Sequence, residues 1–393
     1  MDWKFTPYQQ GLKEDAEAFC KAEHERAPTR WLTGEADLHS DEGWAYHRSV
    51  VKRAAEMGYL CQAWPEEFGG KGHGPVEQLI FAEVAGYYKV PAIPHHNSQV
   101  AFVIMNHGTE DQKKRWLPLL AGGDVTWAEL YSEPNSGSDL ASLTTSAVLQ
   151  GDDYVINGSK TWTTGGHHAT HCFGLVRTDP NQPRHRGLSF FIGKVGEGMQ
   201  FRPVLQMDGS HHLNETFIDD FHITKEEIIG EVNRGWYVMQ AGRSIARANM
   251  EGIASAKRDV EELVEFCNDT SSGGKLLAEN AIWRQKLADL AIGVESMRCF
   301  AYNLCWHQAK GADVGAEAAA CGYSSNELQQ RIAETGLELM GLYGPIESGS
   351  PRAPLFGKFQ SLAQWTTAIT IAGGTTEIRK NVITARGLRL PRD

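Results

Sequence analysis

The chain has 393 residues, which is long enough to bury a sizeable core and to form two or three packed units. Hydrophobic residues make up 41% and charged residues 22% of the sequence, as is ordinary for a soluble globular protein. The formal net charge of −11 argues against a general nucleic-acid-binding or anionic-membrane surface, because either surface would have to neutralise phosphates.

The terminus and the cysteines point to the same cellular setting. The first residues lack the apolar run of a signal peptide, and no uninterrupted apolar stretch approaches the ~20 residues of a membrane span. The seven cysteines are scattered without a Cys-x-x-Cys pair, which favours reduced thiols over a disulfide framework. We therefore expect a cytoplasmic protein with no membrane or nucleic-acid partner.

Residues 1–121 predict a helical N-terminal domain. Apolar residues recur at helical spacing in segments 6–25, 42–57, 76–88, 99–106 and 110–120. Thr6-Pro7 is a plausible helix start, and residues 64–70, rich in glycine and acidic residues, predict a loop between two of the helices.

Residues 122–227 change to a period of two, which predicts a compact central β-barrel-like domain. Residues 187–192 and 215–218 look like strands. A further strand over residues 153–156 is followed by Asn157-Gly158, which predicts a hairpin turn at that dipeptide.

Helical spacing returns in residues 228–393 and predicts a C-terminal four-helix-bundle domain. We expect two long helices over residues 236–267 and 277–308, joined by the polar segment 268–274, and a third over residues 324–343. Long amphipathic helices of this kind often form an oligomer interface. The expected fold class is thus α+β and mostly helical.

Two polar, glycine-containing segments stand out in the central domain, at residues 131–139 and 157–166. Both combine small hydroxyl residues with glycines, and the second contains the single tryptophan Trp162. They offer backbone that a ligand can approach closely, and short hydrogen-bond donors beside a flat aromatic face. A planar, amphipathic cofactor needs these features.

The order of the predicted domains, with these loops in these places, resembles the acyl-CoA dehydrogenase family of flavoproteins over nearly the whole chain. The resemblance rests on motifs at residues 64–70, 131–139, 157–166, 230–236 and 374–388. Because the five motifs are collinear, together they are far more specific than any one of them.

The resemblance implies an FAD cofactor. In the family the first segment runs under the flavin pyrimidine and the thioester, and the second brings its tryptophan against the isoalloxazine with threonines near N5. Hydroxyl and backbone donors there favour the negative charge of reduced flavin. The implied cofactor-binding residues are Tyr131, Ser132, Ser138, Trp162, Thr163, Thr164, Thr375 and Glu377. The implied acyl-CoA substrate contacts are Ser138, Arg247, His96 and Asn97.

The family's catalytic glutamate is missing from both of its usual positions, which here hold Gly373 and Ala246. Desaturation needs a base that takes the proton α to the thioester. Substitutes in this sequence are Glu251, His95 and His96. On a regular helix Glu251 would point ~140° away from Ala246, whereas the histidines have an ordinary pKa near 6.5.

Three explanations for the missing glutamate remain open. Another residue serves as the base, or the chain is a subunit of a hetero-oligomer whose partner carries the glutamate, or it is a CoA-thioester eliminase or desulfinase. The family's FAD adenosine contacts also differ, because residues 268–274 and Glu338 replace the expected turn and glutamine. FAD binding that depends on a partner would follow.

The leading expectation is an FAD-dependent acyl-CoA dehydrogenase that acts on a branched, cyclic or otherwise functionalised thioester, as in fatty-acid or steroid side-chain catabolism. Electrons would pass to an electron-transfer flavoprotein, and the enzyme would be a homo- or heterotetramer. Five histidines, His167, His168, His171, His211 and His212, look ligand-like, but no cysteine or carboxylate completes a zinc spacing. We therefore expect no metal.

Overall fold

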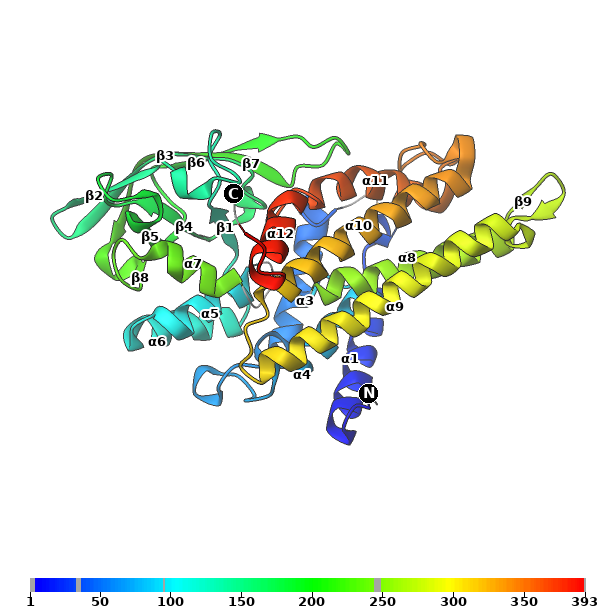
Figure 1. The fold of residues 1–393 in the computed structure, drawn as a ribbon, viewed down its shortest axis with the longest axis horizontal. Coiled ribbons are helices and arrows are strands. Elements are labelled where there is room, and N and C mark those ends of the chain that lie inside the picture. Colours follow the sequence, from blue (N-terminus) through cyan, green and yellow to red (C-terminus); the bar gives the residue numbers. More distant parts are fainter. Residues whose placement is uncertain (1–3, 33–36, 95, 244–248, 392–393) are drawn as a thin grey trace.

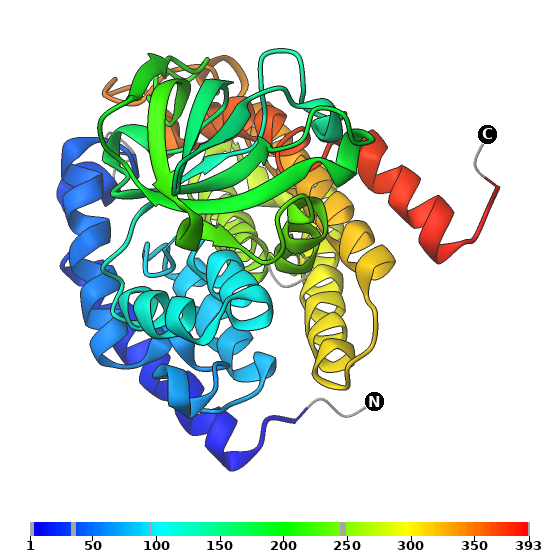
Figure 2. The same cartoon turned by 90° about the vertical axis from the view of Figure 1, so that its left-hand side faces the viewer.

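The computed structural model describes residues 4–32, 37–94, 96–243 and 249–391. Figure 1 shows the β domain beside a group of helices, with the long C-terminal helices running away from it. Figure 2, which faces the β domain, shows the sheet above helices α5 and α6 and the last helix, α12, projecting at the edge. Helical N- and C-terminal domains therefore flank a domain built on a mixed sheet.

Five of the six N-terminal helices in the described residues lie where apolar spacing predicts them. The six are α1 (Pro7–Glu25), α2 (Thr29–Leu32), α3 (Asp41–Glu56), α4 (Pro75–Tyr87), α5 (Asn97–His107) and α6 (Glu110–Ala121). Thr6 begins α1 with a capping box, in which its hydroxyl accepts from the N–H of Gln9 while the Gln9 side chain accepts from the N–H of Thr6. The short α2 was not predicted.

The central domain is an eight-stranded mixed sheet with strand order β6-β7-β3-β2-β4-β5-β8. The strands are β1 (Trp127–Leu130), β2 (Ser146–Gln150), β3 (Asp153–Lys160), β4 (His171–Arg177), β5 (Leu188–Lys194), β6 (Met199–Val204), β7 (Leu213–Thr224) and β8 (Ile228–Ile229). Strand β1 joins off this path and pairs in parallel with β4, and β2 is also parallel to β4.

The predicted hairpin turn at Asn157-Gly158 is wrong, because β3 continues through both residues to Lys160. The β2–β3 turn lies at Gly151, whose φ of 66° suits a glycine. Asn157 instead exchanges hydrogen bonds with Asp220 of β7, and the register shifts by a β-bulge between Ile156 and Gly158. A Cβ at Gly158 would lie 2.6 Å from the Thr145 hydroxyl, so close packing explains this glycine.

The C-terminal domain contains α7 (Gly235–Arg243), α8 (Met250–Asp269), α9 (Ala281–Ala309), α10 (Gly315–Met340), α11 (Lys358–Ile369) and α12 (Thr376–Val382). A small hairpin of β9 (Ser271–Ser272) and β10 (Lys275–Leu276) joins α8 to α9. The single helix predicted over residues 236–267 is wrong, because Asn249 has a left-handed backbone, with φ 42°, and begins a new helix.

Helix α10 begins at Gly315, nine residues before the predicted start at Ser324. Gly322 and Ser325 weaken the helical signal there, since both have lower helix propensity than alanine. Packing overrides that propensity: Ser325 is buried, and a Cβ at Gly322 would lie 2.7 Å from a guanidinium nitrogen of Arg379.

Buried ion pairs join the N-terminal helices to the C-terminal bundle. The carboxylate of Asp259 in α8 lies 2.5 Å from the ammonium of Lys89, which follows α4, and 2.5 Å from that of Lys358 in α11. Helices α4 and α8 also approach closely at Gly86, where a Cβ would lie 2.2 Å from the backbone oxygen of Glu251. No helix in the described part of the chain is long and apolar enough to cross a bilayer.

Candidate functional site

A buried lysine joins the two loops that the sequence singles out. The first loop, residues 131–139, lies between β1 and β2, and Lys160 is the last residue of β3. Its Nζ donates to the backbone oxygens of Tyr131 at 3.0 Å and Leu175 at 3.1 Å, and lies 3.0 Å from Oε1 of Glu133. Residues 157–160 belong to β3, so the second loop comprises residues 161–166.

Glu133 is the counter-ion of this lysine, and its carboxylate also accepts hydrogen bonds from the two threonines that precede β2. Its Oε1 accepts from the N–H of Thr145 at 2.8 Å, and its Oε2 accepts from the N–H and hydroxyl of Thr144. Burial opposes ionisation of this carboxyl, but the Lys160 charge and these donors hold its pKa at about 2. Burial lowers the pKa of Lys160 to about 8, against the opposing attraction of Glu133.

A backbone hydrogen bond adds a second connection between the loops. The N–H of Thr161, the first residue of the second loop, donates to the oxygen of Ser132 at 2.9 Å. Within the first loop the Ser136 hydroxyl donates to the oxygen of Asp139 at 2.9 Å. The two loops therefore form one hydrogen-bonded unit.

Trp162 projects from that unit. Its side chain is 59% exposed, and its backbone has a left-handed φ of 62°, a conformation that is rare for a bulky residue and often marks a functional site. The next residue, Thr163, is fully buried, and its hydroxyl shares a 2.8 Å hydrogen bond with that of Thr216 on β7. Thr163 thus anchors the loop, while the Trp162 indole offers a flat apolar surface.

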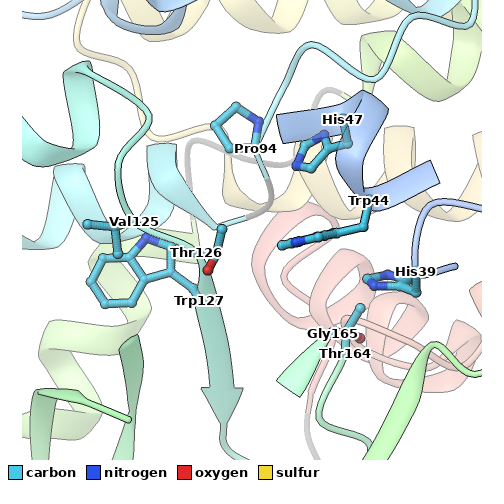
Figure 3. A pocket seen from close by; sticks show the side chains of 9 residues that line it. All are labelled: His39, Trp44, His47, Pro94, Val125, Thr126, Trp127, Thr164 and Gly165. Atoms are coloured by element: carbon cyan, nitrogen blue, oxygen red, sulfur yellow. The ribbon is translucent and has the colours of Figure 1, made fainter. Parts of the chain in front are cut away.

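Thr164 and Gly165 line a small cavity between the second loop and the N-terminal domain. Figure 3 shows the residues that line it, which come from four parts of the chain. The lining residues are His39, Trp44, His47, Pro94, Val125, Thr126, Trp127, Thr164 and Gly165. Its volume of about 20 Å³ is enough for one water molecule.

Histidines crowd one side of this cavity, and His39 and His212 have ring centroids 4.7 Å apart. The rings of His167 and His211 are stacked at 4.0 Å. Burial, together with the neighbouring histidines His168 and His211, lowers the pKa of His167 to about 4. No group of three or more histidine, cysteine or acidic side chains in the described residues could hold a metal ion.

The positions at which a base was expected or proposed differ in their surroundings. Gly373 is exposed, with φ 66°, and Ala246, Arg247 and His95 lie outside the described residues. His96, which precedes α5, is half-buried, and its ring lies edge-on to Phe173 with centroids 5.3 Å apart.

Glu251 is the carboxyl with the clearest chemical signal. It is the second residue of α8, half-buried, and burial raises its pKa to about 7. Its carboxylate makes no hydrogen bond or ion pair with any residue that the structure describes. Because Asn249 interrupts the helix, the ~140° offset expected of a regular helix from Ala246 does not apply to it.

The two helices on either side of Asn249, α7 and α8, pack against different parts of the molecule. Helix α7 packs against β5 and α5, whereas α8 packs against α4 and α9. Residues 244–249 therefore link the β-domain side of the molecule to the helical bundle. A carboxyl that has a raised pKa and no partner among the described residues is a typical functional-site candidate.

The predicted substrate contacts have different surroundings. Asn97 is buried, and its amide donates to the oxygen of Leu120 and accepts from the Trp127 indole N–H at 2.9 Å, so it holds α5, α6 and β1 together. Ser138 is exposed on the first loop. Tyr131 is buried, and its hydroxyl accepts from Nε2 of Gln99 at 3.1 Å. The structure thus gives Asn97 a packing role and leaves Ser138 accessible.

The C-terminal cofactor candidates, Thr375 and Glu377, lie at the start of α12. The Thr375 hydroxyl accepts from the N–H of Ile378 and caps α12, while Glu377 is exposed. No hydrogen bond within the described residues joins either one to the first or second loop. Glu338, at an altered adenosine position, forms an ion pair with Lys286.

Sequence reasoning missed the ion pair of Glu133 and Lys160. A partial signal was present, because Lys160 is the single charged residue of the second segment, whereas the first contains two carboxylates, Glu133 and Asp139. The sequence alone does not show that Glu133 and Lys160, which are 27 positions apart, form a buried ion pair. His39 and Trp44 were also missed, since nothing in the sequence places them beside Thr164.

Comparisons with known proteins agree along the length of the chain. Family models described as acyl-CoA dehydrogenase N-terminal, middle and C-terminal domains match residues 6–124, 128–221 and 233–388. The acyl-CoA dehydrogenase FadE29 of Mycobacterium tuberculosis is 33% identical over 372 residues, covering 91% of this chain and 92% of that protein. FadE26 of the same organism is 29% identical over 399 residues, covering 99% and 98%.

Solved structures share the fold. The "Tcur3481-Tcur3483 steroid ACAD" has a TM-score of 0.88 at 29% identity, and the match covers 100% of both chains. The ChsE4-ChsE5 complex from Mycobacterium tuberculosis has a TM-score of 0.85 at 29% identity, again over 100% of both chains.

Proposed function

The chain belongs to the acyl-CoA dehydrogenase family of oxidoreductases, and from that premise we propose that it uses FAD to introduce a double bond between the α and β carbons of an acyl-CoA thioester. The observation that carries the proposal is the hydrogen-bonded unit of the two loops. It presents the exposed Trp162 indole and the accessible Ser138 hydroxyl from neighbouring segments.

The residues present fit a flavin. A 59% exposed indole is a large apolar surface that a planar ring would cover, and Ser132, Ser138 and Thr164 bring hydroxyl groups on the same two loops. Thr163 serves the site indirectly, since its own hydroxyl is bonded to Thr216. Bound FAD would supply a two-electron acceptor for the hydride that leaves the β carbon.

Glu251 is the proton acceptor that we assign to this reaction. The α C–H bond breaks, its proton forms an O–H bond with the carboxylate, and the electron pair left on the α carbon becomes the new C=C bond as the hydride departs. A carboxyl with a pKa of about 7 is half ionised at neutral pH, so it both accepts and releases a proton readily. His96 remains the second candidate for the base. It is half-buried against Phe173, whose ring also contacts Tyr131 of the first loop.

A second candidate function is that of a subunit that depends on a homologous partner chain. Gly373 favours it, because this exposed glycine in the C-terminal loop cannot accept a proton. Two similar structures are also each named for a pair of chains, Tcur3481 with Tcur3483 and ChsE4 with ChsE5. On this reading the partner would provide the base, and FAD would bind fully only in the complex.

A similar structure supports a substrate class, and the sequence resemblance supports an electron acceptor. One similar structure is titled a steroid ACAD, which supports a bulky, cyclic acyl group as the substrate. We propose an electron-transfer flavoprotein as the acceptor of the electrons, as the sequence resemblance implies.

The test begins with an absorption spectrum of the purified chain, followed by anaerobic titration with straight-chain, branched, cyclic and steroid-side-chain acyl-CoAs. We expect a flavin spectrum that one class of thioester bleaches. Substoichiometric flavin that rises to one per site only with a homologous partner would favour the subunit function. Product release without any electron acceptor would identify an eliminase and overturn dehydrogenation.

A further inference from the structure

We propose that Lys160 is a positioning residue, whose buried ammonium group sets the relative placement of the first and second loops and thereby holds the FAD site in shape. The inference rests on the proposed function, because it assumes that these loops receive FAD. It assigns a role to a residue that does not itself reach the exposed face of Trp162.

The geometry of the contacts supports this role. Lys160 is 1% exposed, and its three Nζ contacts go to the backbone of Tyr131, the carboxylate of Glu133 and the backbone of Leu175. The first two belong to the first loop and the third to β4. Lys160 itself is covalently adjacent to the second loop. One nitrogen thus connects both loops to the sheet, and an ammonium has three N–H donors to satisfy all three contacts.

The charge makes the connection stronger than a neutral hydrogen bond would be. A buried ion pair is sensitive to the loss of one partner, because the other charge is then left without its counter-ion. Glu133 would still have the donors of Thr144 and Thr145 after loss of the lysine. The first loop would therefore stay attached to β2, while its connection to the second loop would be weakened. Cofactor binding should consequently suffer more than folding.

The protonation of Lys160 provides an independent signature. Its pKa of about 8 lies below that of an unfolded lysine, so it loses its charge in the folded protein as pH rises through about 8. Between that pKa and the ordinary value near 10.4 the unfolded chain binds more protons, so this group makes folding stability rise with pH. Weaker FAD binding above pH 8 would thus occur without loss of stability from this residue.

The experiment measures FAD per chain, the FAD dissociation constant and thermal unfolding of the apoprotein for the wild type and Lys160→Met. The double variant Lys160→Met/Glu133→Gln is included because it leaves no uncompensated buried charge if the single variant folds poorly. The matched control is Glu23→Gln, which breaks a buried ion pair with Arg53 at 2.8 Å between α1 and α3.

We expect both Lys160 variants to bind FAD about ten-fold or more weakly, the order of one lost charge-assisted hydrogen bond, and the control to bind within about two-fold of wild type even if it unfolds earlier. We also expect FAD to dissociate faster from the wild type as pH rises through 8, and Lys160→Met to lack this dependence. Wild-type FAD affinity in a well-folded double variant would overturn the inference. So would an equal loss in Glu23→Gln.

Failure of the proposed function gives a different result. A folded wild-type chain that takes up no FAD, alone or with a homologous partner, would overturn the function and this inference together. A wild type that binds FAD, with variants that bind it equally well at every pH, would overturn the inference and leave the function intact.

Discussion

Nε2 of His212 lies 3.7 Å from Oδ1 of Asp37, within ion-pair distance. The contact joins the turn before β7 to the segment before α3, beside the cavity that Thr164 lines. The N–H groups of His39 and Ser40 also donate to Oδ1 of Asp37. Burial opposes ionisation of Asp37, but His212 and these donors lower its pKa to about 2. At neutral pH this interface therefore contains an ionised aspartate beside several histidines.

Acid should destabilise the protein through His47, which lines the same cavity. Burial lowers the pKa of His47 to about 4, and His47 is 2% exposed. Between pH 6.5 and 4 the unfolded chain binds a proton that the folded chain does not, so the free energy of unfolding falls as the pH is lowered through this range, by up to about 3 kcal/mol for this residue. Urea unfolding at several pH values measures the slope. We expect His47→Gln to flatten it, whereas the exposed control His222→Gln should not; equal slopes would contradict the assignment.

Replacing Trp162 should separate cofactor binding from folding. Because the side chain is 59% exposed, we expect Trp162→Ala to change the free energy of unfolding of the apoprotein by less than about 0.5 kcal/mol. Loss of its aromatic surface should nevertheless weaken FAD binding by about ten-fold, with Trp162→Phe intermediate. Flavin fluorescence on release measures the affinity. Unchanged affinity in the alanine variant would show that the ring binds elsewhere.

Glu251→Gln tests the proton acceptor in two ways. Reduction of bound flavin by acyl-CoA should fall by about 10²-fold or more, the usual contribution of a general base, and the wild-type rate should rise with pH through about 7. The raised pKa means that the carboxyl favours folding below its ordinary value near 4.3 and that this contribution is lost as pH rises through 7. We therefore expect the glutamine variant to be more stable at pH 8 by about 1–2 kcal/mol, a figure reduced for partial exposure.

The control for that experiment is Glu265→Gln, which alters an exposed residue of the same helix. It should leave both the flavin reduction rate and the stability difference between pH 5 and pH 8 unchanged. Rapid flavin reduction by Glu251→Gln would contradict this role of Glu251 and favour His96 or a partner chain as the source of the base.

Gly373→Glu should restore a base where the family usually has one. A Cβ at this position meets nothing closer than Nη2 of Arg379 at 3.7 Å, so a side chain fits, although φ 66° costs it about 1 kcal/mol. We expect little gain in the wild-type background and a partial rescue of flavin reduction in Glu251→Gln. Gly373→Gln carries the same backbone cost without a base and should not rescue. A large gain in the wild-type background would instead support a chain that lacks its own base.

Asp259→Asn should destabilise the junction of the N-terminal and C-terminal helices. The substitution removes the counter-ion of Lys89, whereas Lys358 keeps its ion pair with Glu262, so we expect a cost of about 3 kcal/mol, the low end for a broken buried pair. The surface variant Asp289→Asn on α9 should change stability by less than about 0.5 kcal/mol. Chemical denaturation of the apoproteins would reveal the difference, and similar midpoints would contradict the role of the ion pair.

Sequence signals within short segments, such as helix starts and apolar periodicity, predicted helices and strands correctly where tertiary packing did not override them. The helix start at Thr6-Pro7 and the apolar period of α3 and α4 are properties of short segments, so they could be predicted without the fold. At Asn157-Gly158 the same kind of signal was wrong, because the dipeptide serves a bulge and a cross-strand contact with Asp220. At Asn249 a helical period continued across a left-handed residue that interrupts the helix.

The candidate site was predicted in part for the same reason. The two loops were recognisable by composition, yet only tertiary structure shows that Lys160 joins them and that Thr163 is fully bonded to its neighbours. Asn97 was expected near substrate from its position after His96, but its amide bonds are inside the protein. The environment that raises the pKa of Glu251 depends on α4, which lies far away in sequence.

The close approach at Gly86 has a consequence for the placement of Glu251. Two helices from different domains touch there through backbone atoms, and the space between them is smaller than a methyl group. Any larger residue would have to push the first turn of α8, and Glu251 with it, away from α4. A substitution at residue 86, although it adds no functional group, would therefore move the carboxyl that we propose as the proton acceptor.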